Sequence, residues 1–130
     1  MPTLISTTFE PERNLYVMKI TADITAPELV AGYDAAFVHK DFRPDMHAIW
    51  DLSSLRLVSI PVSEIRKLPP ELRDYARKRG DYKAALVPGS ATDRMLLRLY
   101  LTILKLIGTN IRFRICNTLA DAYQWIEENR

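Results

Sequence analysis

One short apolar segment constrains the fold of this chain more than any other feature. Residues 47–52 read His-Ala-Ile-Trp-Asp-Leu, and two serines, Ser53 and Ser54, follow them. An apolar run that ends in an acidic residue and small polar residues is typical of a buried parallel strand. In open α/β sheets, ligands bind where such strands end. The segment therefore predicts an α/β protein with Asp51 at the ligand-facing edge of its sheet.

Hydrophobic periodicity predicts the remaining elements. Alternating or continuous apolar runs between turns predict five strands, at residues 3–9, 15–21, 47–52, 83–87 and 111–115. Apolar residues three or four apart predict a helix that begins after Thr25 and helices at residues 91–107 and 118–128. They also predict a helical region at residues 62–79, which Pro69-Pro70 breaks into a short first helix and a second helix with Pro70 in its first turn. The order is β-β-α-β-α-β-α-β-α. We therefore expect a single, mostly parallel five-stranded sheet with an N-terminal antiparallel hairpin and helices packed on it, in one domain over residues 1–130.

The distribution of charge and the single cysteine limit the setting in which the chain works. Residues 1–51 carry a net charge of −4, residues 52–115 of +8 and residues 116–130 of −2. The basic middle segment could attract an acidic partner, a phosphate or an anionic membrane, or it could simply solvate exposed helix faces. A single cysteine cannot form an internal disulfide. The N-terminal residues do not have the pattern of a secretory leader, and no apolar stretch is long enough for a transmembrane segment. We therefore expect a cytoplasmic protein.

Two loops at the expected carboxyl ends of strands form the candidate ligand site. In the first, Asp51 either contacts a ligand or accepts hydrogen bonds from the backbone of its own loop. In the second, residues 87–94, a helix N-terminus and an arginine could bind an anion, or Ser90 or Thr92 could simply cap the helix. The predicted ligand-binding residues are Asp51, Ser53, Ser54, Gly89, Ser90 and Arg94.

The helix expected at residues 91–107 is apolar on nearly all sides from Met95 onward. Such a helix is either buried beneath neighbouring helices or covered by another molecule. Because a helix on the face of a small sheet normally keeps one face in water, we expect an apolar contact surface for a second copy, a partner protein or a lipid. The residues predicted to form this surface are Leu97, Tyr100, Leu101 and Leu104.

No pattern in the chain indicates catalysis, a metal site or a cofactor. His39 and His47 are far apart and have no cysteine or histidine at ligand spacing. Nothing resembles a Ser-His-Asp or Cys-His arrangement, and Cys116 is interpreted as a small apolar residue. The basic cluster at residues 73–83 lacks a motif that reads a nucleic-acid groove, so we expect no nucleic-acid binding. The chain is predicted not to be an enzyme.

The order of elements, with Trp50-Asp51-Leu52-Ser53 at the end of the third strand, resembles the STAS-like (SpoIIAA-like) family. That family includes bacterial anti-sigma factor antagonists and the cytoplasmic domains of sulfate transporters. Further similarity to its stand-alone bacterial STAS/SEC14-like branch lies in Ala85-Leu86-Val87 and in Ala122-x-x-Trp125-Ile126 of the last helix. The resemblance covers nearly the whole chain and implies the same α/β fold.

One motif of the anti-sigma factor antagonists is missing. They carry an Asp-Ser-Ser-Gly turn with a phosphoacceptor serine, whereas this chain has Ser59-Ile60-Pro61-Val62 in that place. The resemblance therefore implies a non-catalytic, cytoplasmic regulatory or binding module without the usual phosphoacceptor, which forms a homodimer and binds a protein or a small anionic ligand. The alternative is a peripheral protein that binds lipid at a membrane surface, which the basic middle segment and the apolar helix favour.

Overall fold

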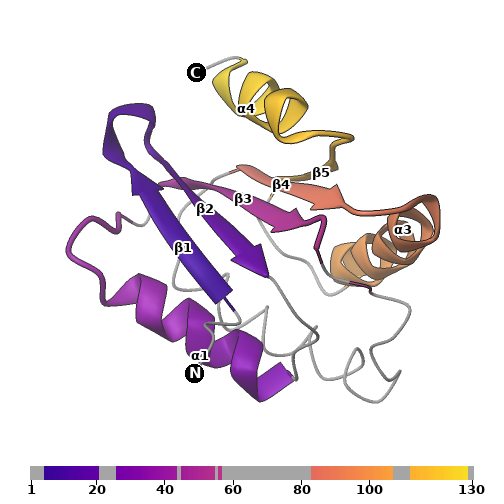
Figure 1. Ribbon diagram of the computed structural model, residues 1–130, viewed down its shortest axis with the longest axis horizontal. Helices are drawn as coiled ribbons and strands as arrows, with labels where there is room; N and C mark the ends of the chain where they lie inside the picture. Colours follow the sequence, from indigo (N-terminus) through magenta and orange to yellow (C-terminus); the bar gives the residue numbers. More distant parts are fainter. Residues whose placement is uncertain are drawn as a thin grey trace.

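Five strands form one mixed sheet in a computed structural model of the chain, which describes residues 5–20, 26–43, 45–54, 56, 83–106 and 112–128. The strands follow the order β1-β2-β3-β4-β5 across the sheet (Figure 1): β1 (Ile5–Glu10), β2 (Leu15–Ile20), β3 (His47–Leu52), β4 (Lys83–Pro88) and β5 (Arg112–Ile115). The described helices are α1 (Ala26–Phe37), α3 (Ala91–Leu106) and α4 (Leu119–Glu127). The predicted α/β fold with its antiparallel hairpin is confirmed, and the helix predicted at residues 62–79 lies outside the described residues.

A tight turn folds β1 back onto β2. Pro11–Arg13 form a short 3₁₀ helix, and Asn14 follows in the left-handed conformation (φ 56°), which asparagine tolerates better than most residues. The turn is also held from outside, because Arg43 Nη2 donates to Asn14 Oδ1 (2.9 Å) and to the Pro11 carbonyl (3.1 Å). The connection after α1 is therefore bonded to the hairpin turn.

The other strand pairs are parallel, so their carboxyl ends lie along one edge of the sheet. All six residues of the inner strand β4 are buried, as its nearly continuous apolar sequence predicts. The edge strand β5 exposes Arg112 and Arg114, while Phe113 and Ile115 turn toward the core. Charged side chains on an edge strand hinder its pairing with another chain.

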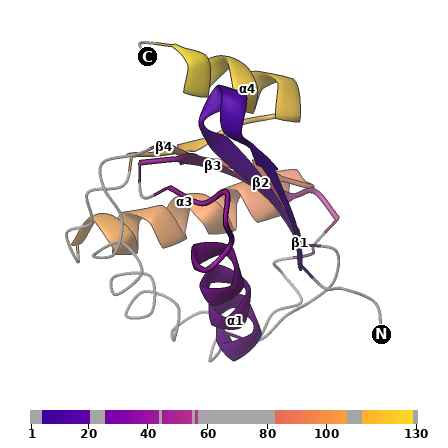
Figure 2. The same ribbon diagram turned by 90° about the vertical axis from the view of Figure 1, so that its left-hand side faces the viewer.

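Helices cover both faces of the sheet, with α1 and α3 on one face and α4 on the other (Figure 2). On the first face, Tyr16 and Trp50 from the strands pack with Leu97 from α3. On the second face, Ile49 packs with Ile126 from α4. Removal of these apolar side chains from water is the main force that holds the layers together.

Both ends of α4 are tied to other parts of the chain. At its start, Thr118 Oγ1 accepts a hydrogen bond from the Asp121 N–H (3.1 Å), as the Thr-x-x-Asp spacing predicts. At its end, the Lys83 ammonium donates to the carbonyls of Trp125 (2.8 Å) and Glu128 (2.6 Å). The Lys83 side chain is only 5% exposed, and its charge also meets the negative end of the helix dipole. Lys83 therefore couples an inner strand to the last helix.

Candidate functional site

The carboxyl ends of β3 and β4 bring the two predicted loops together. The strands stay in register to their ends, with Leu52 opposite Pro88. The next residues touch, because a Cβ atom at Gly89 would lie 2.5 Å from the carbonyl oxygen of Ser53. Only glycine leaves room for this approach, so the two loops form one continuous edge, called here the carboxyl edge (residues 51–54 and 89–94).

Asp51 holds the first of these loops in place. Its side chain is buried, and Oδ1 accepts hydrogen bonds from the Ser53 N–H (3.1 Å) and the Ser53 hydroxyl (2.5 Å). A carboxylate that bonds the backbone two residues further on fixes a turn. The structure thus shows the loop role of Asp51, while a ligand contact stays a prediction. Ser53 and Ser54 are both exposed beside it.

Ser90 caps α3 at the second loop. Its hydroxyl accepts a hydrogen bond from the Asp93 N–H (3.1 Å), and its carbonyl accepts one from the Arg94 N–H (3.0 Å). The carboxyl group of Asp93 is buried in the first turn, where negative charge is favoured by the helix dipole. The cap is therefore Ser90, and Asp93 would compete with any anion that approaches this helix N-terminus.

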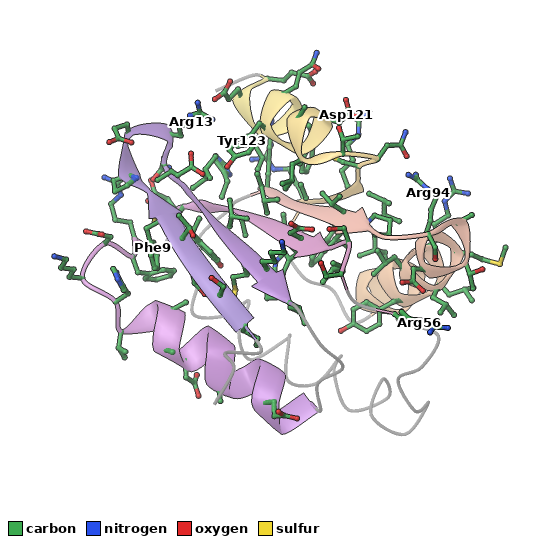
Figure 3. The ribbon with its side chains drawn as sticks, in the orientation of Figure 1. Phe9, Arg13, Arg56, Arg94, Asp121 and Tyr123 are labelled. Atoms are coloured by element: carbon green, nitrogen blue, oxygen red, sulfur yellow. The ribbon has the colours of Figure 1, made fainter. Side chains whose placement is uncertain are left out.

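Two arginines act on the thiol of Cys116, which follows β5. Burial raises the pKa of this thiol and the carboxylate of Asp121 adds to the effect, whereas Arg114 and Arg94 act against it. Figure 3 shows Arg94 near the start of α3 and Asp121 on α4. Because burial prevails, the thiol stays protonated and packs in the core between the sheet and α4, in agreement with its interpretation as a small apolar residue.

Three of the residues predicted to form an apolar contact surface on α3 pack toward the sheet instead. Leu97 is only 5% exposed and lies in the core, and Tyr100 and Leu101 pack against the same core. Their prediction as an open contact surface is therefore wrong. The spacing of three and four residues among them is that of a core-facing stripe. The fourth residue, Leu104, belongs to α3, but its side chain lies outside what the structure describes.

Among the side chains of α3 that the structure describes, the large apolar ones left exposed are Met95 and Leu99, at 65% and 61% exposure. They lie one turn apart on the same side of the helix, and Arg98 is exposed beside them. These three residues are called the α3 surface. Because α3 begins at the carboxyl edge, the α3 surface and the two loops belong to the same end of the molecule (Figure 1).

Within the described part of the chain, the hydroxyl of Tyr100 is buried and has no hydrogen-bond partner. Burial raises the pKa of this phenol far above its ordinary value. An unsatisfied buried hydroxyl costs about 1–3 kcal/mol, so the ring of Tyr100 contributes packing while its hydroxyl opposes folding. Tyr100 is therefore not placed to exchange a proton at an open surface.

Sequence reasoning missed two residues at the opposite, amino edge of the sheet. His47 begins β3, and its Nδ1 accepts a hydrogen bond from the Lys83 N–H (2.9 Å). The side chain of Lys83 then reaches α4, as described above. A signal was present, because lysine at the start of an otherwise apolar strand indicates a buried cation, and buried cations require partners.

Among the described residues, no group of three or more His, Cys, Asp or Glu side chains is placed to hold a metal ion. None of the described helices is long and apolar enough to cross a membrane. Comparisons of the chain with protein-family models, with curated proteins and with solved structures found no match. The class of the protein is therefore defined by its own structure, an α/β fold whose mixed sheet carries helices on both faces.

Proposed function

We propose that the protein is a non-catalytic binding module of the STAS-like type, which works in the cytoplasm as a homodimer and binds a partner protein at the carboxyl edge and the α3 surface. The observation that carries the binding role is the exposure of Met95 and Leu99 beside the two loops. Large apolar side chains that are exposed to solvent next to one another indicate contact with another molecule. The element order and Trp50-Asp51-Leu52-Ser53 support the STAS-like type.

The charges near the α3 surface define the chemistry of the partner. Arg98 is exposed within the surface, Arg94 is half-buried one turn earlier, and residues 52–115 carry a net charge of +8. An apolar centre with cations around it fits a partner whose apolar anchors are surrounded by acidic residues. A small anionic ligand at Gly89 and Ser90 would use the same charges, but it would leave the apolar side chains uncovered.

Leu99→Asp tests this proposal, with Val38→Asp as the matched control. Val38 is also an exposed apolar residue (85%), but it follows α1 and lies outside the α3 surface. Partners that co-purify with the wild-type chain from its native cells are identified, purified and titrated against all three proteins by calorimetry. Because a buried leucine contributes about 1.5–3 kcal/mol, Leu99→Asp should weaken binding roughly 10- to 100-fold, while Val38→Asp binds like the wild type. A partner that binds Leu99→Asp as tightly as the wild type contradicts the proposal.

Lipid binding at a membrane surface is the second candidate, and the same arrangement of Met95 and Leu99 beside Arg98 favours it. Flotation with vesicles of phosphatidylglycerol and phosphatidylcholine, at low and high salt, separates the two candidates. A peripheral lipid-binding protein floats with the anionic vesicles, and Leu99→Asp and high salt both release it. A protein-binding module stays with the soluble fraction under all of these conditions.

A further inference from the structure

We propose that the free edge of β1 pairs antiparallel with β1 of a second copy, so that two five-stranded sheets join into one. This inference rests on the proposed function in one respect, since it specifies where the homodimer forms, and it uses no residue of the α3 surface. β1 and β5 are the two edge strands of the sheet (Figure 1). Within the part of the chain that the structure describes, the outer edge of β1 has no paired strand. Its outward N–H and C=O groups are therefore placed to pair with another chain.

β1 lacks several of the features that usually block an edge strand. Its first five residues, Ile-Ser-Thr-Thr-Phe, contain no charge and no proline. The register with β2 runs without a bulge from Ile5 opposite Ile20 to Glu10 opposite Leu15. β-Branched and aromatic residues also favour the extended conformation. The strand is therefore six residues long, pairs with β2 without a bulge and carries its one charge at Glu10, at its end, which suits its first five residues for pairing.

The other edge strand, β5, is unsuited to pairing with a second copy of itself. It has only four residues, and both of its arginines are exposed. A two-fold pairing centred on Phe113 places Arg112 opposite Arg114, and one centred on Arg114 places that residue opposite itself. Like charges that lie directly opposite destabilise a strand pair. Of the two edge strands that the structure describes, β1 is therefore the one suited to self-pairing.

Geometry selects the register of the β1 pair. Opposite residues of an antiparallel pair point to the same face of the sheet, so the two-fold axis passes through a residue and not between two residues. An axis at Thr7 places Ile5 opposite Phe9 of the second copy and Ser6 opposite Thr8. An axis at Thr8 instead places Thr7 opposite Phe9 and Ser6 opposite Glu10.

In the register centred on Thr7, apolar residues pair on one face of the sheet and polar residues pair on the other. Ile5 and Phe9 are partly buried against the core on the face that α1 covers, and Figure 3 shows Phe9 on that side of β1. Their pairing extends the apolar core across the contact. Ser6 and Thr8 are exposed on the other face, where their hydroxyl groups form a polar pair. In the alternative register Ser6 meets Glu10, whose carboxylate already accepts a hydrogen bond from Tyr123.

Thr7→Cys tests the register, with Thr8→Cys as the control. The native cysteine is the only one in the chain and is buried, so it does not compete. Residues directly opposite one another have Cα atoms about 4.5–5.5 Å apart, within disulfide reach, whereas two Thr8 residues would be about 8 Å apart. On mild oxidation, Thr7→Cys should form a covalent dimer and Thr8→Cys should not. Absence of the Thr7→Cys bridge, or equal bridging in both variants, overturns the proposed pairing.

Two charge variants test the same contact without a cross-link. Ser6→Lys combined with Thr8→Lys places like charges opposite one another twice, while Ser6→Glu combined with Thr8→Lys places opposite charges there. Sedimentation should show that the dimer of the two-lysine variant dissociates roughly tenfold or more readily than the dimer of the Glu/Lys variant.

Leu99→Asp separates this inference from the proposed function. If β1 forms the contact, Leu99→Asp loses the partner protein but stays dimeric, and the two-lysine variant becomes monomeric but still binds the partner. A wild-type chain that sediments as a monomer overturns the β1 pairing. The β1 pairing is also overturned if Leu99→Asp is monomeric while the two-lysine variant stays dimeric. That result would assign the dimer contact to the α3 surface.

Discussion

Replacing Lys83 by methionine tests how the last helix is held to the sheet. Methionine keeps a flexible, unbranched stem of similar length, so the substitution removes the ammonium group without opening a large cavity. The described interactions that it removes include two hydrogen bonds to the carbonyls of Trp125 (2.8 Å) and Glu128 (2.6 Å) and a longer one to Ile126 (3.5 Å). The ammonium also lies 5.2 Å from the centroid of the Trp125 ring, close enough for a cation–π contact.

Two opposing free energies decide the magnitude. A hydrogen bond from a charged donor contributes roughly 1.5–3 kcal/mol, and a cation at a helix C-terminus adds roughly 0.3–1 kcal/mol. Against this stands the desolvation of an ammonium that is only 5% exposed, which costs several kcal/mol. Methionine removes this donor from the carbonyls of Trp125 and Glu128 in a partly buried site. We therefore expect the free energy of unfolding of the variant to fall by about 3 kcal/mol. That is a large share of the 5–15 kcal/mol by which a domain is typically stable.

Urea denaturation followed by tryptophan fluorescence measures this loss. With a slope of about 1.5 kcal/mol per molar urea, the midpoint should fall by about 2 M. Lys19→Met is the control, because Lys19 is exposed on β2 and its replacement should change stability by less than about 0.5 kcal/mol. Hydrogen exchange should also quicken at the Glu128 amide, which bonds to the carbonyls of the last turn of α4. If Lys83→Met is as stable as Lys19→Met, the desolvation cost cancels the hydrogen bonds and the ammonium does not hold α4.

Three further predictions concern the carboxyl edge and the contact of α4 with the hairpin. Asp51→Ala removes the acceptor of two hydrogen bonds from Ser53 and should lower the free energy of unfolding by about 1–2 kcal/mol in urea. Gly89→Ala places a Cβ atom 2.5 Å from the Ser53 carbonyl and should cost roughly 1–3 kcal/mol, whereas an unchanged melting temperature would show that the loops do not touch. Burial and the hydrogen bond to Glu10 raise the pKa of Tyr123 from 10.0 to about 12. The protonated phenol therefore stabilises the folded chain below about pH 10, and this contribution to the free energy of unfolding is lost as the pH rises through about 12. An ultraviolet titration of tyrosinate, in which Glu10→Gln lowers this pKa, checks the assignment.

The sequence predicts the strands well because periodicity and turn residues mark them. The strand predicted at residues 47–52 has those bounds in the structure, and the one predicted at residues 83–87 is longer by Pro88 alone. The meeting of the two loops also follows from the sequence, because consecutive parallel strands end at one edge. Even the turn role of Asp51 could be foreseen, since an aspartate bonds most readily to the backbone two residues further on.

The face that α3 turns to the sheet could not be predicted in the same way. Apolar residues occur nearly all round this helix, so its sequence contains more than one stripe with helical spacing. The sequence predicts that the side with Leu97 and Tyr100 is at the surface, whereas packing on the sheet leaves Met95 and Leu99 exposed. Which stripe becomes the core depends on how the helix lies across the strands, and this is a tertiary property that periodicity alone does not contain.

The two edges of the sheet are held by hydrogen bonds of different range, which bears on where a partner binds. At the amino edge, Arg43 bonds to Asn14 across 29 residues and Lys83 to Trp125 across 42 residues. At the carboxyl edge, the described bonds from Ser53 to Asp51 join residues only two positions apart. These bonds preserve the shape of the first loop, and the close approach of Gly89 to the Ser53 backbone seats the second loop against it. The α3 surface starts from that same edge, so the proposed binding contact lies beside two loops that hold one another in place.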